Sequence, residues 1–239
     1  MAIGLLLGLA HFSQAGLAGQ HPAAPVLPEA LSGSASVFTM VPGAGINASA
    51  FISVKYDMAQ NKEYFQVGEH LKANIGVDAY IDFTTQTVDV VVSVPFGHPV
   101  RCLRYANLTL EPKSPNIINS SCPFGGAAFF QGMPANQWNC DYAISAGFSD
   151  GLAVSIMSSG NTIMGETLFV PATQKDPAYV SFITFDQFIP LPSLPTSVFT
   201  PPSLCSAKAV QMPGSFSILS LFKLFLHPSS SNFLLKLDE

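Results

Sequence analysis

The chain has 239 residues, of which 48% are hydrophobic and only 10% are charged, against about 25% charged residues in an average soluble domain. Ten Lys and Arg residues and a formal net charge of -5 exclude a protein that binds nucleic acid by neutralising many phosphates. The same balance excludes intrinsic disorder and a coiled coil built from charged heptads. A compact, apolar-rich domain remains, or a chain that meets lipid.

The N-terminus predicts a signal peptide over residues 1–18. An apolar stretch of about nine residues precedes the small residues Ala15 and Ala18, after one of which we expect cleavage. The stretch is too short to span a bilayer, which takes about 20 apolar residues. It lacks the usual Lys or Arg at its start, so a buried N-terminal strand or helix is the alternative.

Sequons and cysteines fit secretion. Three Asn-x-Ser/Thr tripeptides predict glycosylation at Asn47, Asn107 and Asn119. An even number of cysteines predicts disulfides in an oxidising compartment, with three connectivities open. The four are Cys102, Cys122, Cys140 and Cys205. Their spacing is too wide for a zinc site made of close ligand pairs, and four reduced, buried thiols are the alternative.

Composition divides the rest of the chain into three parts. Residues 19–36 are rich in Pro, Ala, Gly and Ser and predict a linker. Residues 37–206 are expected to form one β domain. Residues 207–239 are a tail without an assigned structure, whose apolar run 216–226 is too short to cross a membrane. An interfacial helix is the alternative for that run.

The β prediction comes from period-two alternation of apolar and polar residues. In residues 73–83 every second residue is apolar, as in a strand with one buried face. About ten such segments, separated by turn signals such as Gln60-Asn61 and Ser159-Gly160-Asn161, imply an all-β, mainly antiparallel sandwich or open barrel. No window shows a convincing helical period.

The inward face of these strands is the candidate ligand site. A half-barrel with one uncovered apolar face would form a hydrophobic pocket, whereas a plain packed core is the alternative. The pocket residues that we expect are Ile75, Val77, Ile81, Phe83, Val90 and Val92. On the opposite parity, Asp78 and Asp82 share one strand face and are the candidate calcium ligands, with solvated surface charge as the alternative.

One motif would fit catalysis, but its context argues against it. Residues 147–151 match the G-x-S-x-G nucleophile elbow around Ser149, and Asp176 or Asp186 and then His227 follow. The elbow requires a strand before it and a helix after it, whereas residues 152–156 continue as a strand, and Asp150-Gly151 is a typical hairpin turn. We expect no catalytic residues and no enzymatic activity.

Several short motifs, in order, resemble the ependymin and ependymin-related secreted glycoproteins. They are Ser53-Val54-Lys55-Tyr56-Asp57, Asn61-Lys62-Glu63-Tyr64-Phe65, Arg101-Cys102-Leu103, Trp138, Phe169-Val170-Pro171-Ala172-Thr173 and Val198-Phe199-Thr200-Pro201-Pro202-Ser203-Leu204-Cys205. The resemblance implies two curved antiparallel sheets forming a half-barrel with a deep hydrophobic pocket. It also implies a Cys102–Cys205 disulfide, which leaves Cys122 to Cys140. Phe169 stands where many members carry a cysteine.

These features together predict a secreted, non-enzymatic glycoprotein that binds a hydrophobic, lipid-like ligand in a β-lined pocket. The alternative is an extracellular-matrix or cell-adhesion glycoprotein with calcium-dependent contacts, because the resembled family is associated with the matrix, calcium and, in some members, lysosomes. A serine hydrolase using Ser149 is a third hypothesis. The expected partners are a lipid or hydrophobic small molecule, the extracellular matrix and a second copy of the chain in a homodimer, with no nucleic acid and no transmembrane segment.

Overall fold

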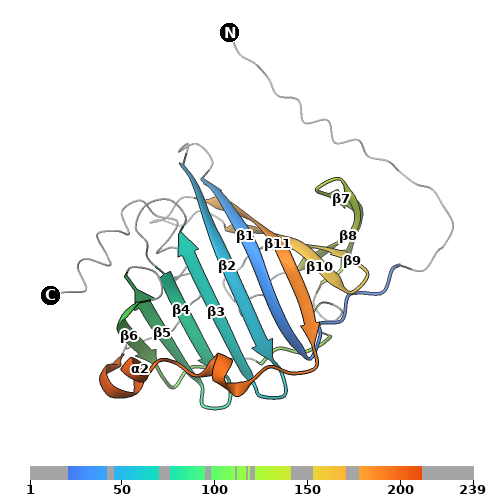
Figure 1. Ribbon diagram of the computed structural model, residues 1–239. Coiled ribbons are helices and arrows are strands. Elements are labelled where there is room, and N and C mark those ends of the chain that lie inside the picture. The colour runs from blue at the N-terminus through green and yellow to red at the C-terminus, as the bar shows by residue number, and fades with distance from the viewer. Residues whose placement is uncertain are drawn as a thin grey trace, which may run out of the picture.

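A computed structural model of the protein describes residues 21–41, 46–69, 76–94, 98–110, 112–116, 118, 122–140, 153–170 and 178–211. The expected signal peptide, Ile75, Asn119, the Ser149 motif and the apolar run 216–226 lie outside the described residues. Within the described part, all strands belong to one curled sheet (Figure 1). The predicted all-β, antiparallel half-barrel is therefore confirmed.

The sheet contains twelve strands in the order β12-β6-β5-β4-β3-β2-β1-β11-β10-β9-β8-β7. Their bounds are β1 Ala30–Val41, β2 Ile46–Asp57, β3 Lys62–Glu69, β4 Gly76–Asp82, β5 Thr87–Ser93, β6 Pro99–Tyr105, β7 Phe124–Phe130, β8 Met133–Cys140, β9 Ala153–Ser159, β10 Thr162–Val170, β11 Tyr179–Leu191 and β12 Val210–Gln211. All pairs are antiparallel except β12 with β6. Most neighbours in the sheet are also neighbours in sequence, as in a meander.

The first strand joins the two halves of the sheet. One edge of β1 pairs with β2 and the other with β11, so the sheet is continuous where two separate sheets were expected. The linker prediction for residues 19–36 is wrong from residue 30 onward, because those residues begin β1. Gly33 shows close packing in this part of β1, because a Cβ on it would lie 3.2 Å from the carbonyl oxygen of Gln187 in β11.

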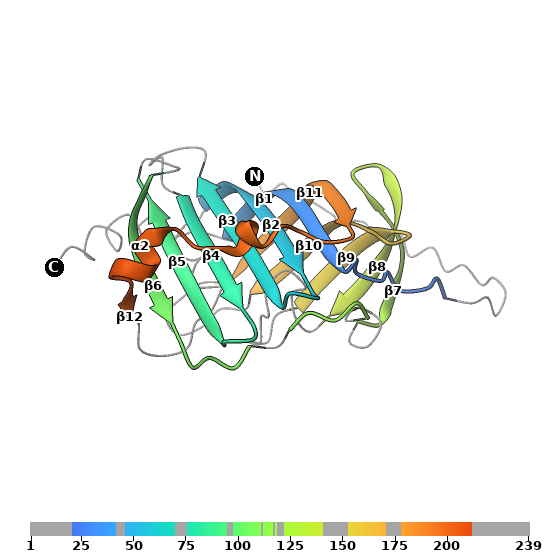
Figure 2. The ribbon, with the colours of Figure 1, turned by 60° about the horizontal axis from the view of Figure 1, so that its bottom comes forward.

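A long connection crosses from one edge of the sheet to the other. Strands β6 and β7 are consecutive in sequence but lie near opposite ends of the strand order. The described residues between them, 106–110, 112–116, 118, 122 and 123, are spread along the width of the curled sheet (Figure 2). We call residues 106–123 the crossing segment. Its described part is held by hydrogen bonds from Leu108 N to Gln86 O and from Leu27 N to Pro115 O.

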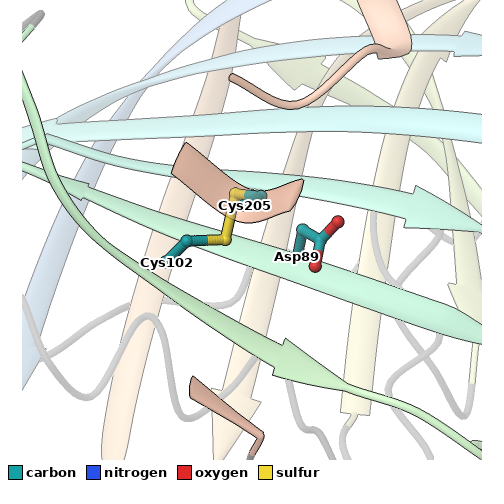
Figure 3. A group of neighbouring side chains, drawn as sticks. All are labelled: Asp89, Cys102 and Cys205. Atoms are coloured by element: carbon teal, nitrogen blue, oxygen red, sulfur yellow. A yellow bond between two sulfur atoms is a disulfide. The ribbon is translucent and has the colours of Figure 1, made fainter. Parts of the chain in front are cut away.

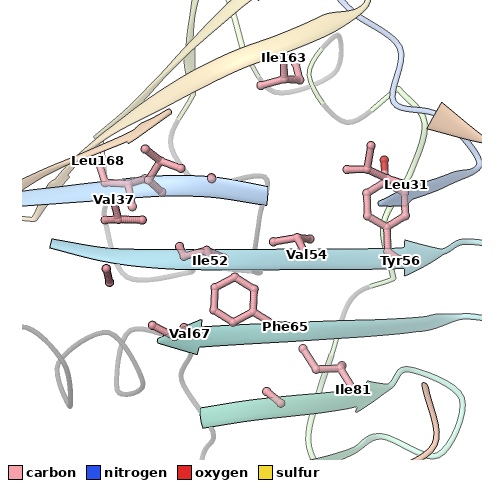
Figure 4. Close-up of a cluster of buried hydrophobic side chains, with 14 of the residues drawn as sticks. Leu31, Val37, Ile52, Val54, Tyr56, Phe65, Val67, Ile81, Ile163 and Leu168 are labelled. Carbon is pink, nitrogen blue, oxygen red and sulfur yellow. The ribbon is translucent and has the colours of Figure 1, made fainter. Parts of the chain in front are cut away.

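The core lies on the concave side of the sheet. Inward positions of successive strands supply aliphatic and aromatic side chains, including Ile52, Phe65 and Ile81, which are at most 4% exposed (Figure 4). Ile118 of the crossing segment is fully buried in the same cluster. The alternation seen in the sequence therefore sorts side chains between this core and the convex face.

After β11 the chain runs back along the sheet to its first half (Figure 2). This stretch contains a short 3-10 helix, η1 (Thr196–Phe199), and the helix α2 (Ser203–Lys208). The disulfide Cys102–Cys205 ties α2 to β6 on the convex face, over the buried Val91. The chain then ends its described part in β12, beside β6.

Candidate functional site

A small cleft, with room for about one water molecule, lies at one rim of the half-barrel, between the β2–β3 turn, the β4–β5 turn and the crossing segment. Its lining residues are Tyr56, Asp57, Met58, Asn61, Lys62, Phe83, Pro112 and Lys113. The turn that forms one side is tight: Asn61 adopts a φ of 52°, a left-handed conformation that Asn tolerates better than most residues. The cleft therefore sits where the apolar interior meets a set of polar side chains.

A buried ionic pair lies beside this cleft. Lys113 Nζ is 3.1 Å from Glu63 Oε1, and the two side chains are 8% and 2% exposed. Glu63 belongs to β3 and points to the concave side, opposite Ile81 of β4, whereas Lys113 comes from the crossing segment. Lys113 Nζ also lies over the ring of Tyr56, 5.4 Å from its centroid, which places an ammonium on an aromatic face.

Burial shapes the chemistry of both acidic groups in this cluster. Burial raises the pKa of the Glu63 carboxyl, although the adjacent Lys113 ammonium counteracts part of the effect. Burial also raises the pKa of the Tyr56 phenol, helped by the nearby charges of Glu63 and Glu29. Tyr56 therefore remains protonated at neutral pH and offers an O–H donor, because even an unperturbed tyrosine titrates near pH 10.

Asp57 holds the mouth of the cleft in place. Its carboxylate accepts hydrogen bonds from the backbone and side-chain nitrogens of Gln60, at 3.0 and 2.8 Å, and from Leu194 N at 2.9 Å. Gln60 Nε2 additionally donates to Leu194 O. Burial alone would raise the pKa of Asp57, but these donors outweigh it and the pKa is lowered. Asp57 thus links the β2–β3 turn to the chain that follows β11.

The expected pocket residues lie together on the concave face, where they form the packed core. Val77, Ile81, Val90 and Val92 belong to the buried cluster, with exposures from 1% to 7%. Phe83 is half-buried, packs against that cluster and lines the cleft. Ile75 lies outside the described residues. The cleft thus continues from the face that the alternation pattern singled out.

The two candidate calcium ligands lie apart on the convex face and are engaged by protein donors. Asp78 Oδ1 accepts hydrogen bonds from the Tyr64 hydroxyl and Gln66 Nε2. Asp82 Oδ1 accepts from two backbone nitrogens of the following turn, and its Oδ2 lies 3.5 Å from Lys62 Nζ. Four positions along an extended strand separate their Cα atoms by about 13 Å, so the structure does not bring these carboxylates together.

Among the described residues, one group of potential metal ligands is compact: Asp89, Cys102 and Cys205 (Figure 3). Its two sulfurs are joined in a disulfide, and metal binding requires thiolates. Asp89 receives two hydrogen bonds of 2.6 Å from the Arg104 guanidinium, in the bidentate geometry typical of Arg and carboxylate. This group is therefore a structural anchor of β5, β6 and α2.

The remaining predicted site residues are placed as follows. The cysteines form the disulfides Cys102–Cys205 and Cys122–Cys140. Asn107 is exposed at the start of the crossing segment, with a φ of 57°. Asn47 lies in β2, and Asn119 is outside the described residues. No helix in the described part of the chain is long and apolar enough to cross a membrane.

Sequence reasoning missed the buried polar cluster in and beside the cleft, namely Tyr56, Glu63 and Lys113. A signal for one of them was present: Glu63 has the same parity as Phe65 and Val67, so a charged residue occupies an inward position of an otherwise apolar strand face. Lys113 carries no comparable local signal, because only the course of the crossing segment brings it to Glu63.

Comparisons with known proteins concern the fold alone. No family model and no curated protein matches the chain. The solved structures that are similar to it include a DUF1329 family protein from Desulfovibrio piger, at 11% identity over 72% of this chain and 90% of that one, with a TM-score of 0.33. They also include a LolA superfamily protein from Nitrosomonas europaea, at 9% identity over 74% of this chain and 92% of that one, with a TM-score of 0.38.

The predicted ependymin relationship is wrong: neither a model of that family nor a curated member of it matches the chain. The motifs that suggested it have local structural explanations. Tyr56-Asp57 and Asn61 form and cap a tight hairpin turn, and the closing Pro-Pro-x-x-Cys is the start of a short helix tied down by a disulfide. The matrix-adhesion and lysosomal expectations came from that family and lose its support.

Proposed function

We propose that this protein is a non-enzymatic binding protein for an apolar, lipid-like ligand, which enters by widening the rim cleft and takes a place among the side chains that pack the concave face. The observation that carries the proposal is the continuity between that face and the cleft. Phe83 belongs to both, because it packs against the buried cluster and lines the cleft. Sites for apolar ligands combine such a surface with a few fixed polar groups.

Two further observations support a binding role in an oxidising compartment. The charged side chains in and beside the cleft are paired, Glu63 with Lys113 and Lys62 with Asp82, so these pairs leave no charge without a partner for a charged substrate. Both disulfides pair cysteines within this one domain, and such pairs persist in secreted or periplasmic proteins and not in a reducing cytosol.

Displacement of a fluorescent apolar probe from the full chain tests the proposal, with native mass spectrometry of the purified protein to detect co-purified lipid. Met58→Glu places a charge in the cleft and should weaken probe binding at least tenfold, whereas Met58→Leu should preserve it. Phe38→Ser is the matched control, because Phe38 is an apolar side chain on the convex face with 42% exposure. A probe lost with Phe38→Ser but retained by Met58→Glu would contradict the proposal.

A further inference from the structure

The convex face of the sheet carries a contiguous apolar patch over β1, β11 and β10, which lie side by side (Figure 1). Phe38 of β1 is directly opposite Phe182 of β11. In the next row Met40 of β1 is opposite Val180 of β11, and Val180 is opposite Phe169 of β10. Opposed side chains in a sheet have Cβ atoms about 5 Å apart, so these five residues, which we call the convex patch, form one surface.

The same face is polar on the other half of the sheet. Tyr64 and Gln66 of β3 hydrogen-bond to Asp78 of β4, and the Lys55 ammonium of β2 lies over the Tyr64 ring. Such side chains are typical of a sheet face that meets only water. The convex patch departs from the pattern of its own face, and contiguous exposed apolar surface marks interaction sites on proteins and membranes.

The size and curvature of the convex patch argue against a second copy of the chain as its partner. Its four large side chains, Phe38, Met40, Phe169 and Phe182, are 37% to 44% exposed. At about 200 Å² for each whole side chain, they present about 300 Å², whereas a stable protein interface takes about 800 Å² from each partner. Because the patch lies on the outer side of a curled sheet, the surrounding surface bends away from a second copy and adds little area.

The charges around the convex patch favour a surface without net charge. Strands β1, β10 and β11 contain no Lys or Arg, and their only acidic residues are Glu166 and Asp186. Glu166 is buried, and Asp186 accepts a 2.8 Å hydrogen bond from the Ser36 hydroxyl. Attraction to anionic lipid needs basic residues near the surface, whereas burial of apolar side chains in a lipid interface does not.

We propose that the convex patch is a membrane-docking surface, whose Phe and Met side chains enter the interfacial region of a lipid bilayer without net charge. The inference goes beyond the proposed function, because the patch shares no residue with the lining of the rim cleft. A fluid lipid surface adapts to a small convex patch, so it needs neither the area nor the matching shape that a protein partner requires.

Flotation of the full chain with phosphatidylcholine vesicles tests the proposal, at about 0.15 M and about 1 M salt. We expect binding that the added salt does not weaken and that is no stronger when about a third of the lipid is phosphatidylserine. Phe182→Ser should weaken binding at least tenfold, because about 80 Å² of apolar surface no longer leaves water on docking. Val100→Ser is the matched control and should keep binding: Val100 is 56% exposed on β6, in the other half of the sheet.

Phe182→Trp keeps an aromatic ring in the convex patch and reports its surroundings. We expect this variant to bind the vesicles and its added tryptophan fluorescence to shift to shorter wavelength when they are present. Trp138, the one tryptophan of the chain, is 4% exposed and supplies a constant background. Because this variant retains the packing of an aromatic side chain, it tests the inference even if Phe182→Ser fails to fold.

Absence of flotation with the unchanged chain, equal flotation of Phe182→Ser, or binding that requires phosphatidylserine would each overturn the inference. Self-association without vesicle binding, abolished by Phe182→Ser in sedimentation velocity, would assign the convex patch to a second copy and overturn it as well. Displacement of the apolar probe by the same proteins tests the proposed function separately. A chain that binds the probe but no vesicle refutes only the docking surface, and one that binds vesicles but no probe refutes only the proposed function.

Discussion

Lys113 and Glu63 are 50 positions apart in sequence, yet the Lys113 ammonium lies 3.1 Å from a Glu63 carboxylate oxygen in a buried pair. The contact fastens the crossing segment to the concave face of β3. Gln86 supports the same segment from the β4–β5 turn: its side-chain carbonyl accepts a 2.6 Å hydrogen bond from Leu110 N. The rim of the half-barrel is therefore held by contacts that belong to no strand ladder.

Removing the lysine from this pair should destabilise the fold strongly. Lys113→Met leaves Glu63 buried without its partner, which costs about 3–5 kcal/mol for a buried pair, measured by urea unfolding. Lys62→Met is the matched control: its pair with Asp82 is partly exposed, with side chains 29% and 26% exposed, and should contribute about 0–1 kcal/mol. Similar losses of unfolding free energy in the two variants would contradict a buried, stabilising pair between Lys113 and Glu63.

The same variant should respond to pH in a defined direction. The pKa of Glu63 is raised in the folded state, and loss of the Lys113 charge raises it further. A raised carboxyl pKa gives stability that is present below the unfolded value, near 4.5, and is lost as pH rises through the folded pKa. The loss of unfolding free energy in Lys113→Met should therefore shrink as pH is lowered from 7 to 4. A loss that grows over the same range would be inconsistent with a buried carboxylate.

Asp57 should show the opposite dependence. Its pKa is lowered from the usual 3.8 because the donors of Gln60 and Leu194 outweigh the effect of burial. A lowered pKa gives stability that is present above the unfolded value and is lost as pH falls through the folded pKa. Asp57→Asn should cost about 1.5–3 kcal/mol at pH 7, the range for hydrogen bonds to charged groups. The difference in unfolding free energy between Asp57→Asn and the unchanged protein should narrow as pH falls below about 4. Denaturant unfolding at several pH values measures it.

Close packing at Gly68 can be tested with a pair of substitutions. A Cβ at this position would lie 2.1 Å from the Phe51 ring on the neighbouring strand. Gly68→Ala should therefore lower the melting temperature, by an amount equivalent to about 1–3 kcal/mol for an overpacked site. In a Phe51→Ala background the same change should cost much less. Additive losses in the double variant would show that the Phe51 ring is not the obstacle.

Glycosylation can be tested at Asn107, which is exposed at the start of the crossing segment. Expression in a eukaryotic secretory pathway should add a glycan there, seen as a mass shift that a glycosidase removes. Thr109→Ala destroys the tripeptide while keeping Asn107 itself, whose φ of 57° favours Asn. An unchanged glycopeptide map in this variant would show that Asn107 is not the acceptor.

The two disulfides should differ in their contribution to stability. Cys102–Cys205 closes a loop with a sequence separation of 103, against 18 for Cys122–Cys140. The chain-entropy model gives about 4.7 kcal/mol for the longer loop and about 3 kcal/mol for the shorter one. Replacing each pair by serines should thus lower the denaturation midpoint more for the first pair. A larger drop in the midpoint for Cys122–Cys140 would mean that local packing, and not loop length, sets how much each disulfide stabilises the fold.

Local patterns in the sequence determined the fold class. The inward residues Val77, Ala79 and Ile81 are buried as their alternation predicts, since side chains in a strand point to opposite faces with a period of two. The predicted turns at Asn61 and Gly160 both contain residues with positive φ, because the residue types that tolerate that conformation are visible in sequence. These features need only a few neighbouring residues.

The tertiary structure decided how these elements assemble and what lines the cleft. Small residues made the first part of β1 look like a linker, but pairing with both β2 and β11 turns it into the centre of the sheet. Likewise, nothing near Lys113 in sequence indicates that it will meet Glu63 and the ring of Tyr56. Alternation is a local property of one strand, whereas strand order and the path of a crossing segment depend on contacts between residues far apart in the chain. The apolar face could therefore be predicted from the sequence, but its polar mouth could not.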